Sequence, residues 1–273
     1  MGRVAISLSL VFAFANLVVA QSAKSPVTES TIRADMQLHV CKNKDRLEAV
    51  KSLLKAKGIS DEELKAEDRD NVENLIFTKK GTTDQIIVIG AHYDKVSDGC
   101  GALDNWTGIV VLANLMAAYK GVTTDKTLVF AAFGREEEGL LGARMFVKQI
   151  PKENRGQYCS MVNLDSFGLT YPNVLSNMSN KKMTEFAKQL ADEVKMPFSA
   201  PTIVDADADS SAFNEKDIPA LTLSGLTSKW KDYLHTTKDK IDYVNQQAVF
   251  VGYNFASLYL RRIETLPCGA FRK

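Results

Sequence analysis

The amino-acid sequence predicts an α/β protein: a single domain with a mixed, mostly parallel twisted sheet and helices on both faces. Short apolar runs typical of strands alternate along the chain with longer segments of helical periodicity. The inner strand-like runs are apolar at every position, as in strands that are buried on both faces. Roughly 250 residues follow a predicted leader, which is a common length for one undivided α/β domain.

The first 20 residues have the features of a secretory signal peptide. A basic residue, Arg3, precedes an apolar stretch, and Val18 and Ala20 form the small-residue cleavage pattern before Gln21. A membrane anchor is the alternative, but the stretch is short for a spanning helix and polar residues interrupt it. We therefore expect a secreted or periplasmic protein with no membrane segment after removal of the leader.

Residues 21–70 are expected to form an N-terminal helical segment that packs on the main domain, residues 71–273. A helix is expected from about residue 28 to residue 57, with a break near Asn43 and with Gly58 as its C-cap. The apolar residues that recur at helical spacing are Ile32, Met36, Val40, Leu47, Val50 and Leu54.

The charged stretch DEELKAEDRD that follows is expected to be a solvated helix face and a turn. Two strands come next, NLIFTKK and QIIVIGAH, and the connecting GTTD has the composition of a hairpin turn. Such a hairpin would place an antiparallel strand at one edge, which makes the predicted sheet mixed. The later elements are expected to be helix 107–119, strand 126–134, helix 139–149, strand 160–165, helix 181–194, strand 219–224 and helix 246–263.

Composition excludes some classes of partner. The 34 basic and 33 acidic residues nearly cancel, so nothing indicates a nucleic-acid binder or a membrane-surface binder. The sequence sets no expectation for the oligomeric state. Four cysteines in an exported chain permit up to two disulfides, and the three possible pairings stay open.

Acidic and histidine side chains follow the ends of several predicted strands. In open α/β sheets the working site lies outside the carboxyl ends of the strands, so these side chains are expected to converge. Imidazole and carboxylate together suit zinc, and two zinc ions that share one bridging carboxylate need about this many donors. His39 is set aside, as a helix residue with no acidic partner at useful spacing. The candidate residues are His92, Asp94, Asp104, Glu136, Glu137, Asp165 and His235.

Five motifs at these positions resemble those of one family, in the family's order. They are AHYD, GALDNWTG, EEEGLLGA, NLDSFG and HTTKD, and a further block, DSSAFNEKDIPAL, resembles one that normally begins Asp-His. The family is that of the co-catalytic zinc aminopeptidases of the aminopeptidase S and aminopeptidase Y type, related to glutamate carboxypeptidase and the glutaminyl cyclases. The resemblance covers most of the chain from about Asn71 and implies a zinc peptidase domain with a zinc exopeptidase-like fold.

The resemblance also implies a set of metal ligands. His92 and Asp165 would complete the coordination of one zinc ion, and Glu137 and His235 that of a second. Asp104 would bridge the two ions.

Two further roles are implied by the same resemblance. Asp94 would accept the other ring N–H of His92 and so fix its tautomer. Glu136 would be the general base that takes a proton from the attacking water.

The sequence departs from the family pattern at three positions, none of them a predicted ligand. Trp106 stands where relatives carry a small residue, Ser210 replaces the usual His, and Asp217 replaces a common Gly. Two glycosylation sequons begin at Asn105 and Asn177, and the first is expected to be unmodified because it adjoins the bridging ligand.

The predicted function is that of a secreted zinc exopeptidase acting on peptides, in the first place an aminopeptidase that hydrolyses N-terminal residues. The alternatives are a glutaminyl-peptide cyclotransferase with one zinc ion and a carboxypeptidase or dipeptidase of the same family. A catalytically inactive binding module is disfavoured because every ligand position is filled. A preference for apolar N-terminal residues is expected, with Trp106, Phe133, Phe167 and Tyr233 as candidate pocket residues, although core packing is the simpler role for the two Phe residues.

Overall fold

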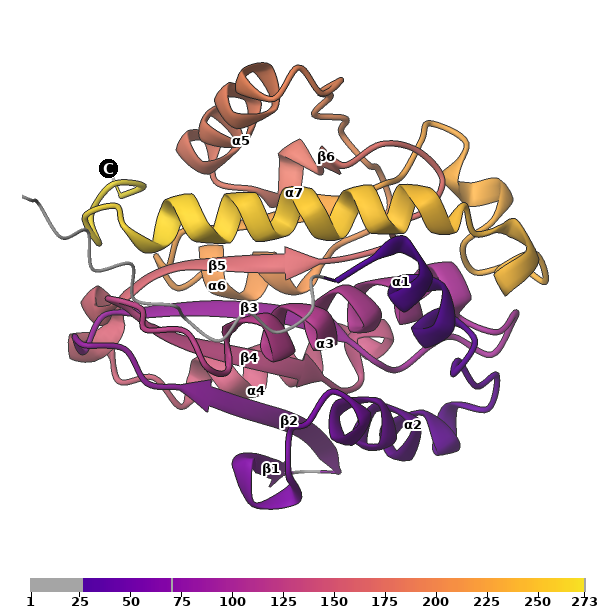
Figure 1. The fold of residues 1–273 in the computed structure, drawn as a ribbon, viewed down its shortest axis with the longest axis horizontal. Helices are drawn as coiled ribbons and strands as arrows, with labels where there is room; N and C mark the ends of the chain where they lie inside the picture. Colours follow the sequence, from indigo (N-terminus) through magenta and orange to yellow (C-terminus); the bar gives the residue numbers. More distant parts are fainter. Residues whose placement is uncertain (1–26, 70, 273) are drawn as a thin grey trace, which may run out of the picture.

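The computed structural model describes residues 27–69 and 71–272, and a seven-stranded sheet runs through the centre of this part of the chain (Figure 1). The strand order is β1-β2-β4-β3-β5-β7-β6. The strands are β1 (Leu64–Arg69), β2 (Val72–Lys79), β3 (Ile86–His92), β4 (Thr127–Phe133), β5 (Tyr158–Leu164), β6 (Asn173–Val174) and β7 (Ala220–Ser224). Strands β4, β3, β5 and β7 are parallel, and the strands outside them pair antiparallel. The predicted mixed sheet with a parallel core is confirmed.

Helices cover both faces of this sheet. In Figure 1 the long α7 crosses in front of the sheet, and α4 and α6 lie behind it. Helices α1 and α3 pack with α7 on the front face, and α4 packs against α6 on the other. The helices are α1 (Glu29–Met36), α2 (Asn43–Ala56), α3 (Thr107–Tyr119), α4 (Leu141–Lys148), α5 (Lys181–Glu193), α6 (Asp209–Asn214) and α7 (Gln246–Glu264).

The central elements form where the apolar pattern places them. Every residue of β4 is buried, as expected for a strand with helices on both faces. Helix α3 is buried at every position from Thr107 to Met116, which explains why it is apolar around its whole circumference. The break expected near Asn43 is also present, because α1 ends at Met36 and α2 begins at Asn43.

The expected hairpin between β2 and β3 is wrong. Strand β4 lies between them, antiparallel to β2 and parallel to β3. The loop that was expected to be a hairpin turn pairs with the residues before β4 instead: Thr82 N–H donates to Thr124 O at 3.0 Å and Thr83 N–H to Asp125 O at 2.9 Å. Turn composition indicates that the chain reverses, but it does not say which strand becomes the neighbour.

The stretch expected to be a solvated helix face is also different. It contains a single 3-10 turn, Asp61–Glu63, followed by β1, which pairs antiparallel with β2. Most side chains of β1 are exposed, and charged side chains suit an edge strand because they discourage pairing with another chain. The sheet therefore includes residues on both sides of residue 70. The short α6 and β6 were not expected either.

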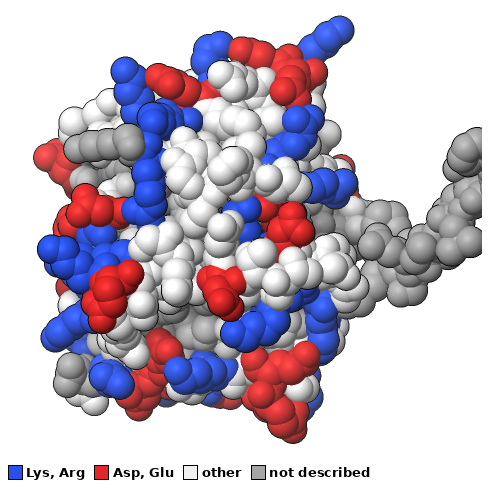
Figure 2. Space-filling model, turned by 90° about the vertical axis from the view of Figure 1, so that its left-hand side faces the viewer, with Lys and Arg blue, Asp and Glu red and all other residues white. Residues whose placement is uncertain are grey.

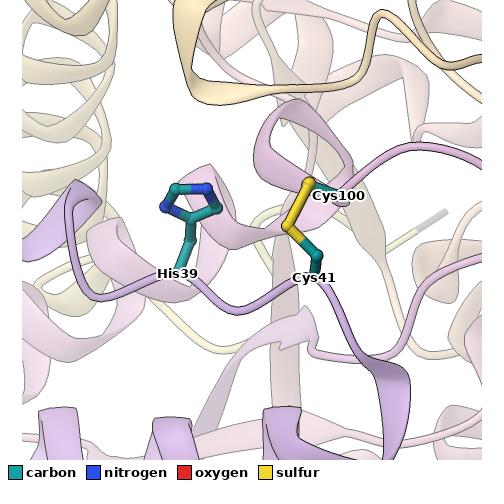
Figure 3. A group of neighbouring side chains, drawn as sticks. All are labelled: His39, Cys41 and Cys100. Carbon is teal, nitrogen blue, oxygen red and sulfur yellow. A yellow bond between two sulfur atoms is a disulfide. The ribbon is translucent and has the colours of Figure 1, made fainter.

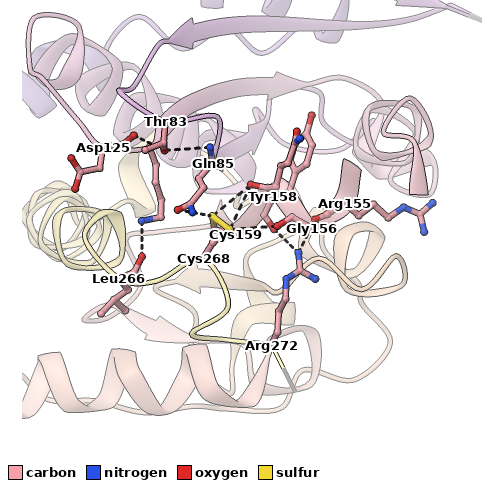
Figure 4. The surroundings of a disulfide bond; sticks show 12 residues. Thr83, Gln85, Asp125, Arg155, Gly156, Tyr158, Cys159, Leu266, Cys268 and Arg272 are labelled. Atoms are coloured by element: carbon pink, nitrogen blue, oxygen red, sulfur yellow. Dashed lines mark hydrogen bonds between the residues drawn. A yellow bond between two sulfur atoms is a disulfide. The ribbon is translucent and has the colours of Figure 1, made fainter. Parts of the chain in front are cut away.

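The four cysteines form two disulfides, Cys41–Cys100 and Cys159–Cys268. The first joins the segment between α1 and α2 to the loop after β3 (Figure 3). The second joins the start of β5 to the C-terminal tail, where Arg272 donates to the carbonyls of Arg155 and Tyr158 (Figure 4).

The surface in Figure 2 carries Lys and Arg interspersed with Asp and Glu, without a large area of one sign. Within the described residues no helix combines the length and the apolar character needed to span a bilayer. The predicted signal peptide lies outside the described residues.

Candidate metal centre

A cavity of about 270 Å³ opens at the carboxyl ends of the parallel strands, where the sequence predicts the site. His92 is the last residue of β3, Glu136 and Glu137 follow β4, and Asp165 follows β5. Five predicted metal ligands and the predicted base line this cavity: His92, Asp104, Glu136, Glu137, Asp165 and His235.

Asp104 lies between the two imidazole rings. Its Oδ1 is 3.1 Å from Nε2 of His92, and its Oδ2 is 3.1 Å from Nε2 of His235. Each carboxylate oxygen therefore faces a different histidine. This is the arrangement that a carboxylate bridging two cations would have.

Each histidine has a further carboxylate beside it. Nε2 of His92 lies 3.7 Å from Oδ1 of Asp165, and Nε2 of His235 lies 3.1 Å from Oε2 of Glu137. The side chain of His92 is buried, whereas that of His235 is half exposed at the cavity. Glu136 is more distant, with Oε2 4.0 Å from Nε2 of His92.

This donor set fits a metal ion. Two groups of residues each offer three possible ligand atoms that lie within 4.8 Å of one another. One group is His92, Asp104 and Glu137, and the other is His92, Glu136 and Asp165. Ligands about 2.0–2.2 Å from a tetrahedral zinc ion lie about 3.3 Å apart, close to the observed separations. The second oxygen of Glu137, Oε1, is buried and has no hydrogen-bond partner among the residues that the structure describes, so it too is available as a metal ligand.

The loop after β3 bends back to bring Asp104 to this place. Gly99 and Gly101 adopt positive φ angles of 67° and 60°, which glycine tolerates without steric cost. The chain then forms an irregular turn, Ala102–Trp106, in which Asp104 and Asn105 have non-helical backbone angles and are joined by a cis peptide bond.

Two side chains fix this turn. The buried Asn105 donates to Leu164 O at 2.9 Å and accepts from the backbone N–H of Ser166 at 3.0 Å, so it ties the turn to the end of β5. Asp239 accepts from the backbone N–H of Leu103 at 2.6 Å and of Asp104 at 3.3 Å. Sequence reasoning missed Asp239 as a site residue, although it is the last residue of the quoted HTTKD motif.

The carboxylate of Asp94 lies near the ring of His92, but its shortest contacts are with another segment. Its carboxylate accepts hydrogen bonds from the backbone N–H groups of Glu136, at 2.9 Å, and Glu137, at 3.1 Å. Nδ1 of His92 lies 3.3 Å from the backbone carbonyl of Asp94 and 3.7 Å from its carboxylate. The carboxylate of Asp94 therefore orients the turn that carries the two glutamates, and its backbone carbonyl orients the imidazole.

The site carries several negative charges at close range, and they shift one another's pKa values. Burial opposes ionisation of Asp104, but contacts with His235 and His92 hold its pKa well below the usual value. The carboxylates of Asp104 and Glu137 raise the pKa of His235 to about 10. Burial raises the pKa of Glu136 well above its usual value, although His92 opposes this shift. A bound cation is the natural counterion for such a cluster.

Asp209 is a second buried carboxylate that sequence reasoning did not single out. It is fully buried at the start of α6, and neither of its oxygens has a hydrogen-bond partner within the described residues. Burial raises its pKa to about 8. Its neighbour Ser210, which stands where relatives carry His, is also buried and donates to the carbonyl of Met178 at 2.8 Å. Met178 lines the cavity, so Ser210 contacts a lining residue without lining the cavity itself.

Part of the cavity lining is apolar, but not because of the aromatic residues expected there. Trp106, Phe133 and Phe167 are fully buried in the core, and Tyr233 packs against Tyr243 with ring centroids 5.8 Å apart. The apolar residues of the lining are Leu140, Leu175, Met178, Ile203, Ala206, Leu226, Trp230 and Leu234.

A third group of possible ligand atoms, His39 with Cys41 and Cys100, is not a metal site in this structure. Figure 3 shows the ring of His39 beside the disulfide that joins the two cysteines. Metal ions bind thiolates, and the disulfide leaves neither sulfur as a thiolate. Nδ1 of His39 contacts the carbonyl of Met36 at 3.1 Å.

Comparison with known proteins places these features in a family. Aminopeptidase YwaD of Bacillus subtilis (strain 168) is 28% identical over 198 residues, which cover 67% of this chain and 43% of the relative. The chain thus spans less than half the length of this relative.

Two solved structures share the fold. The Legionella pneumophila LapA aminopeptidase has a TM-score of 0.74 at 19% identity, over 88% of this chain and 71% of its own. An Acidobacteriales bacterium glutaminyl cyclase has a TM-score of 0.70 at 15% identity, over 90% of this chain and 99% of its own. The model of Peptidase family M28 matches residues 74–252. This range is more than half of the chain and includes all seven predicted site residues. The chain therefore belongs to Peptidase family M28.

Proposed function

We propose that this protein is a zinc-dependent exopeptidase, in the first place an aminopeptidase that hydrolyses N-terminal residues of peptides. The observation that carries the proposal is the position of Asp104, with one carboxylate oxygen 3.1 Å from each of two histidine rings. Membership of Peptidase family M28 and the resemblance to aminopeptidase YwaD support the same reading.

Five residues would hold two zinc ions. His92 and Asp165 would bind one ion, Glu137 and His235 the other, and Asp104 would contact both. The separations between these donors and the unpartnered oxygen of Glu137 support this division. When bound, the two ions would lower the pKa of a water molecule and polarise the substrate carbonyl.

Glu136 would then act as the general base. Its carboxylate lines the cavity beside the proposed ligands, with Oε2 4.0 Å from Nε2 of His92, where it could accept a proton from a water molecule. The same carboxylic acid would pass this proton to the leaving amine. The carboxylate of Asp94 would hold Glu136 in place by accepting a hydrogen bond from the backbone N–H of Glu136.

The cavity suits the N-terminal end of a peptide. The carboxylates that line it would favour a cationic or metal-bound amine, and its apolar lining residues would contact the first side chain. We therefore expect a preference for apolar N-terminal residues. The leader predicted at residues 1–20 supports secretion or export to a periplasm.

A glutaminyl-peptide cyclotransferase is the second candidate, because one observation favours it. The chain covers 99% of the Acidobacteriales bacterium glutaminyl cyclase, compared with 43% of aminopeptidase YwaD. In that case the same cavity would hold an N-terminal Gln, and its amine would attack its own side-chain amide with release of ammonia.

One experiment separates the candidates. The full chain is loaded with zinc and offered peptides with a free apolar N-terminus, the same peptides N-acetylated, and peptides that begin with Gln. An aminopeptidase releases single residues only from peptides with a free N-terminus. Release of C-terminal residues from the acetylated set would indicate a carboxypeptidase. Ammonia release with ring closure, and no cleavage in any set, would overturn the aminopeptidase proposal in favour of the cyclase.

A further inference from the structure

We propose that Arg46, from the N-terminal helix α2, is a positioning residue for the metal centre. This inference rests on the proposed function, because it takes His92 and Asp104 to be metal ligands. Arg46 lies outside residues 74–252, the part of the chain that matches the family, so its role would be a feature of this chain's N-terminal segment.

The guanidinium of Arg46 is fully buried, and its hydrogen bonds within residues 27–69 and 71–272 all go to backbone carbonyls. One bond goes to Tyr93, the residue after His92. Two go to Cys100 O at 3.1 Å and Gly101 O at 3.2 Å, in the loop that leads to Asp104. A single side chain thus connects the end of β3 to the start of the Asp104 turn.

The loop is shaped around this side chain. A Cβ atom on Gly101 would come within 2.9 Å of Nη1 of Arg46 and within 2.8 Å of the carbonyl oxygen of Asp104. On the other side, the guanidinium carbon lies 5.6 Å from the ring centroid of Trp106, two residues after Asp104. Arg46 therefore contacts the turn both before and after the proposed bridging ligand.

The N-terminal segment is itself held at several points. The indole N–H of Trp106 donates to Asp35 O at 3.2 Å, and Asn43 Oδ1 accepts from the backbone N–H of Lys95 at 3.2 Å. The Cys41–Cys100 disulfide crosses the same junction. Arg46 thus projects from a helix that is held at several other points. Its guanidinium is therefore held in place by contacts other than its own, and the loop can be positioned by it.

The chemistry of the guanidinium explains why arginine is needed here. Its planar fork offers several donors in fixed directions and can satisfy carbonyls from two chain segments at once. A buried cation also offsets part of the negative charge of the site, since Asp239 and Asp104 both attract it. A lysine at this position would keep the charge but could not reproduce the fork.

The test compares metal binding by the full-length wild type, Arg46→Lys and Arg46→Met, with Co²⁺ as the probe. The readouts are the dissociation constant and the visible absorption spectrum, which reports the coordination geometry. Both variants are expected to bind Co²⁺ about 10–100-fold more weakly, with an altered spectrum and with Arg46→Lys the less affected. Lys126→Met is the matched control, because Lys126 is a buried cation that donates to the carbonyls of Glu264 and Leu266, at the opposite end of β4 from the site.

The results separate this inference from the proposed function. Failure of the wild type to bind Co²⁺ would count against the metal centre itself. A metal-binding wild type together with folded Arg46 variants of unchanged affinity and spectrum would overturn the positioning role alone. Equal loss of affinity in Lys126→Met would also overturn it, because the effect would then follow from lost stability.

A second measurement needs no variant and decides the question if the Arg46 variants do not fold. Coupling between two sites is reciprocal, so zinc binding should stabilise the segment that positions the site. Hydrogen exchange of the wild type is measured with and without zinc. Zinc is expected to slow exchange in α2, Asn43–Ala56, and to leave α5, Lys181–Glu193, unchanged. Protection confined to the loops that carry the ligands would contradict the inference.

Discussion

At the scale of single residues, neighbouring carboxylates have different surroundings and therefore different proposed roles. Glu137 lies 3.1 Å from the ring of His235 and keeps an unpartnered oxygen, as a ligand would. Glu136 is more distant, with Oε2 4.0 Å from Nε2 of His92. Under the proposed function, adjacent positions in one turn would supply a metal ligand and a proton acceptor.

We predict that Glu136→Gln lowers kcat by about 10²–10⁴-fold, because the amide cannot accept a proton from water. Zinc content should stay at the wild-type level, since five other donors remain. Peptide hydrolysis and metal analysis on the same sample check both points. Glu138→Gln is the control: Glu138 is exposed and pairs with Arg135, and the variant should remain active. Undiminished turnover by zinc-loaded Glu136→Gln would refute the general-base assignment.

Asp94→Asn is expected to lower zinc affinity or kcat/KM by about 10–100-fold, as changes next to a ligand shell do. The Asp94 carboxylate accepts from two adjacent backbone N–H groups, and an amide offers only one oxygen for them. Isothermal titration with zinc and steady-state kinetics measure the two effects. Asp98→Asn, at an exposed position of the same loop, should behave as wild type. If the two variants are indistinguishable, Asp94 does not position the glutamates.

At the scale of elements, much of the structure could be predicted from the sequence. Helix 107–119 is observed at the predicted residues, because an apolar run of this length can only be buried. Strand pairing could not be predicted: β4 lies between β2 and β3, and periodicity carries no information on which strands are neighbours. The edge strand β1 was missed because its side chains are mostly charged and exposed.

The site was predictable to a similar extent. The rule that ligands lie at strand ends is sufficient to bring His92 and Asp165 together. The parts that could not be predicted are contacts made by the backbone, such as those of Asp94 and Asp239 with N–H groups. The contribution of Arg46 belongs to the same class, because it binds carbonyls and leaves no motif in the sequence.

The two disulfides offer a matched comparison between elements. Their loops of 59 and 109 residues predict similar losses of unfolding free energy, about 4 and about 5 kcal/mol, when the cysteines are replaced by serine. We expect Cys41→Ser/Cys100→Ser to weaken zinc binding as well, because that bridge joins the N-terminal segment to the Asp104 loop. Cys159→Ser/Cys268→Ser should lose stability only. Equal zinc affinity in the two double variants would contradict this expectation.

At the scale of the whole molecule, the metal centre connects segments that are far apart in the chain. Its proposed ligands come from the ends of β3 and β5, the turn before α3, the loop after β4 and the loop before α7. Without a cation, several carboxylates at close range repel one another, so metal binding should stabilise the entire fold.

We therefore predict that a chelator lowers the melting temperature. Zinc at 100 times its dissociation constant adds about 2.7 kcal/mol to the free energy of unfolding, which corresponds to about 5–10 °C for a domain of this size. Differential scanning calorimetry before and after chelation, and after zinc is restored, measures the shift. His39→Ala should show the same shift, because His39 contacts a backbone carbonyl and lies beside a disulfide. An unchanged melting temperature would argue against a metal that holds these segments together.

The central claim is that Asp104 bridges two zinc ions at the carboxyl ends of the parallel strands. Anomalous scattering at the zinc absorption edge, from crystals of the zinc-loaded protein, tests it most directly. We predict two peaks about 3.5–4 Å apart, one on each side of the Asp104 carboxylate, with His92 beside one and His235 beside the other. A single peak, or peaks away from Asp104, would contradict the claim.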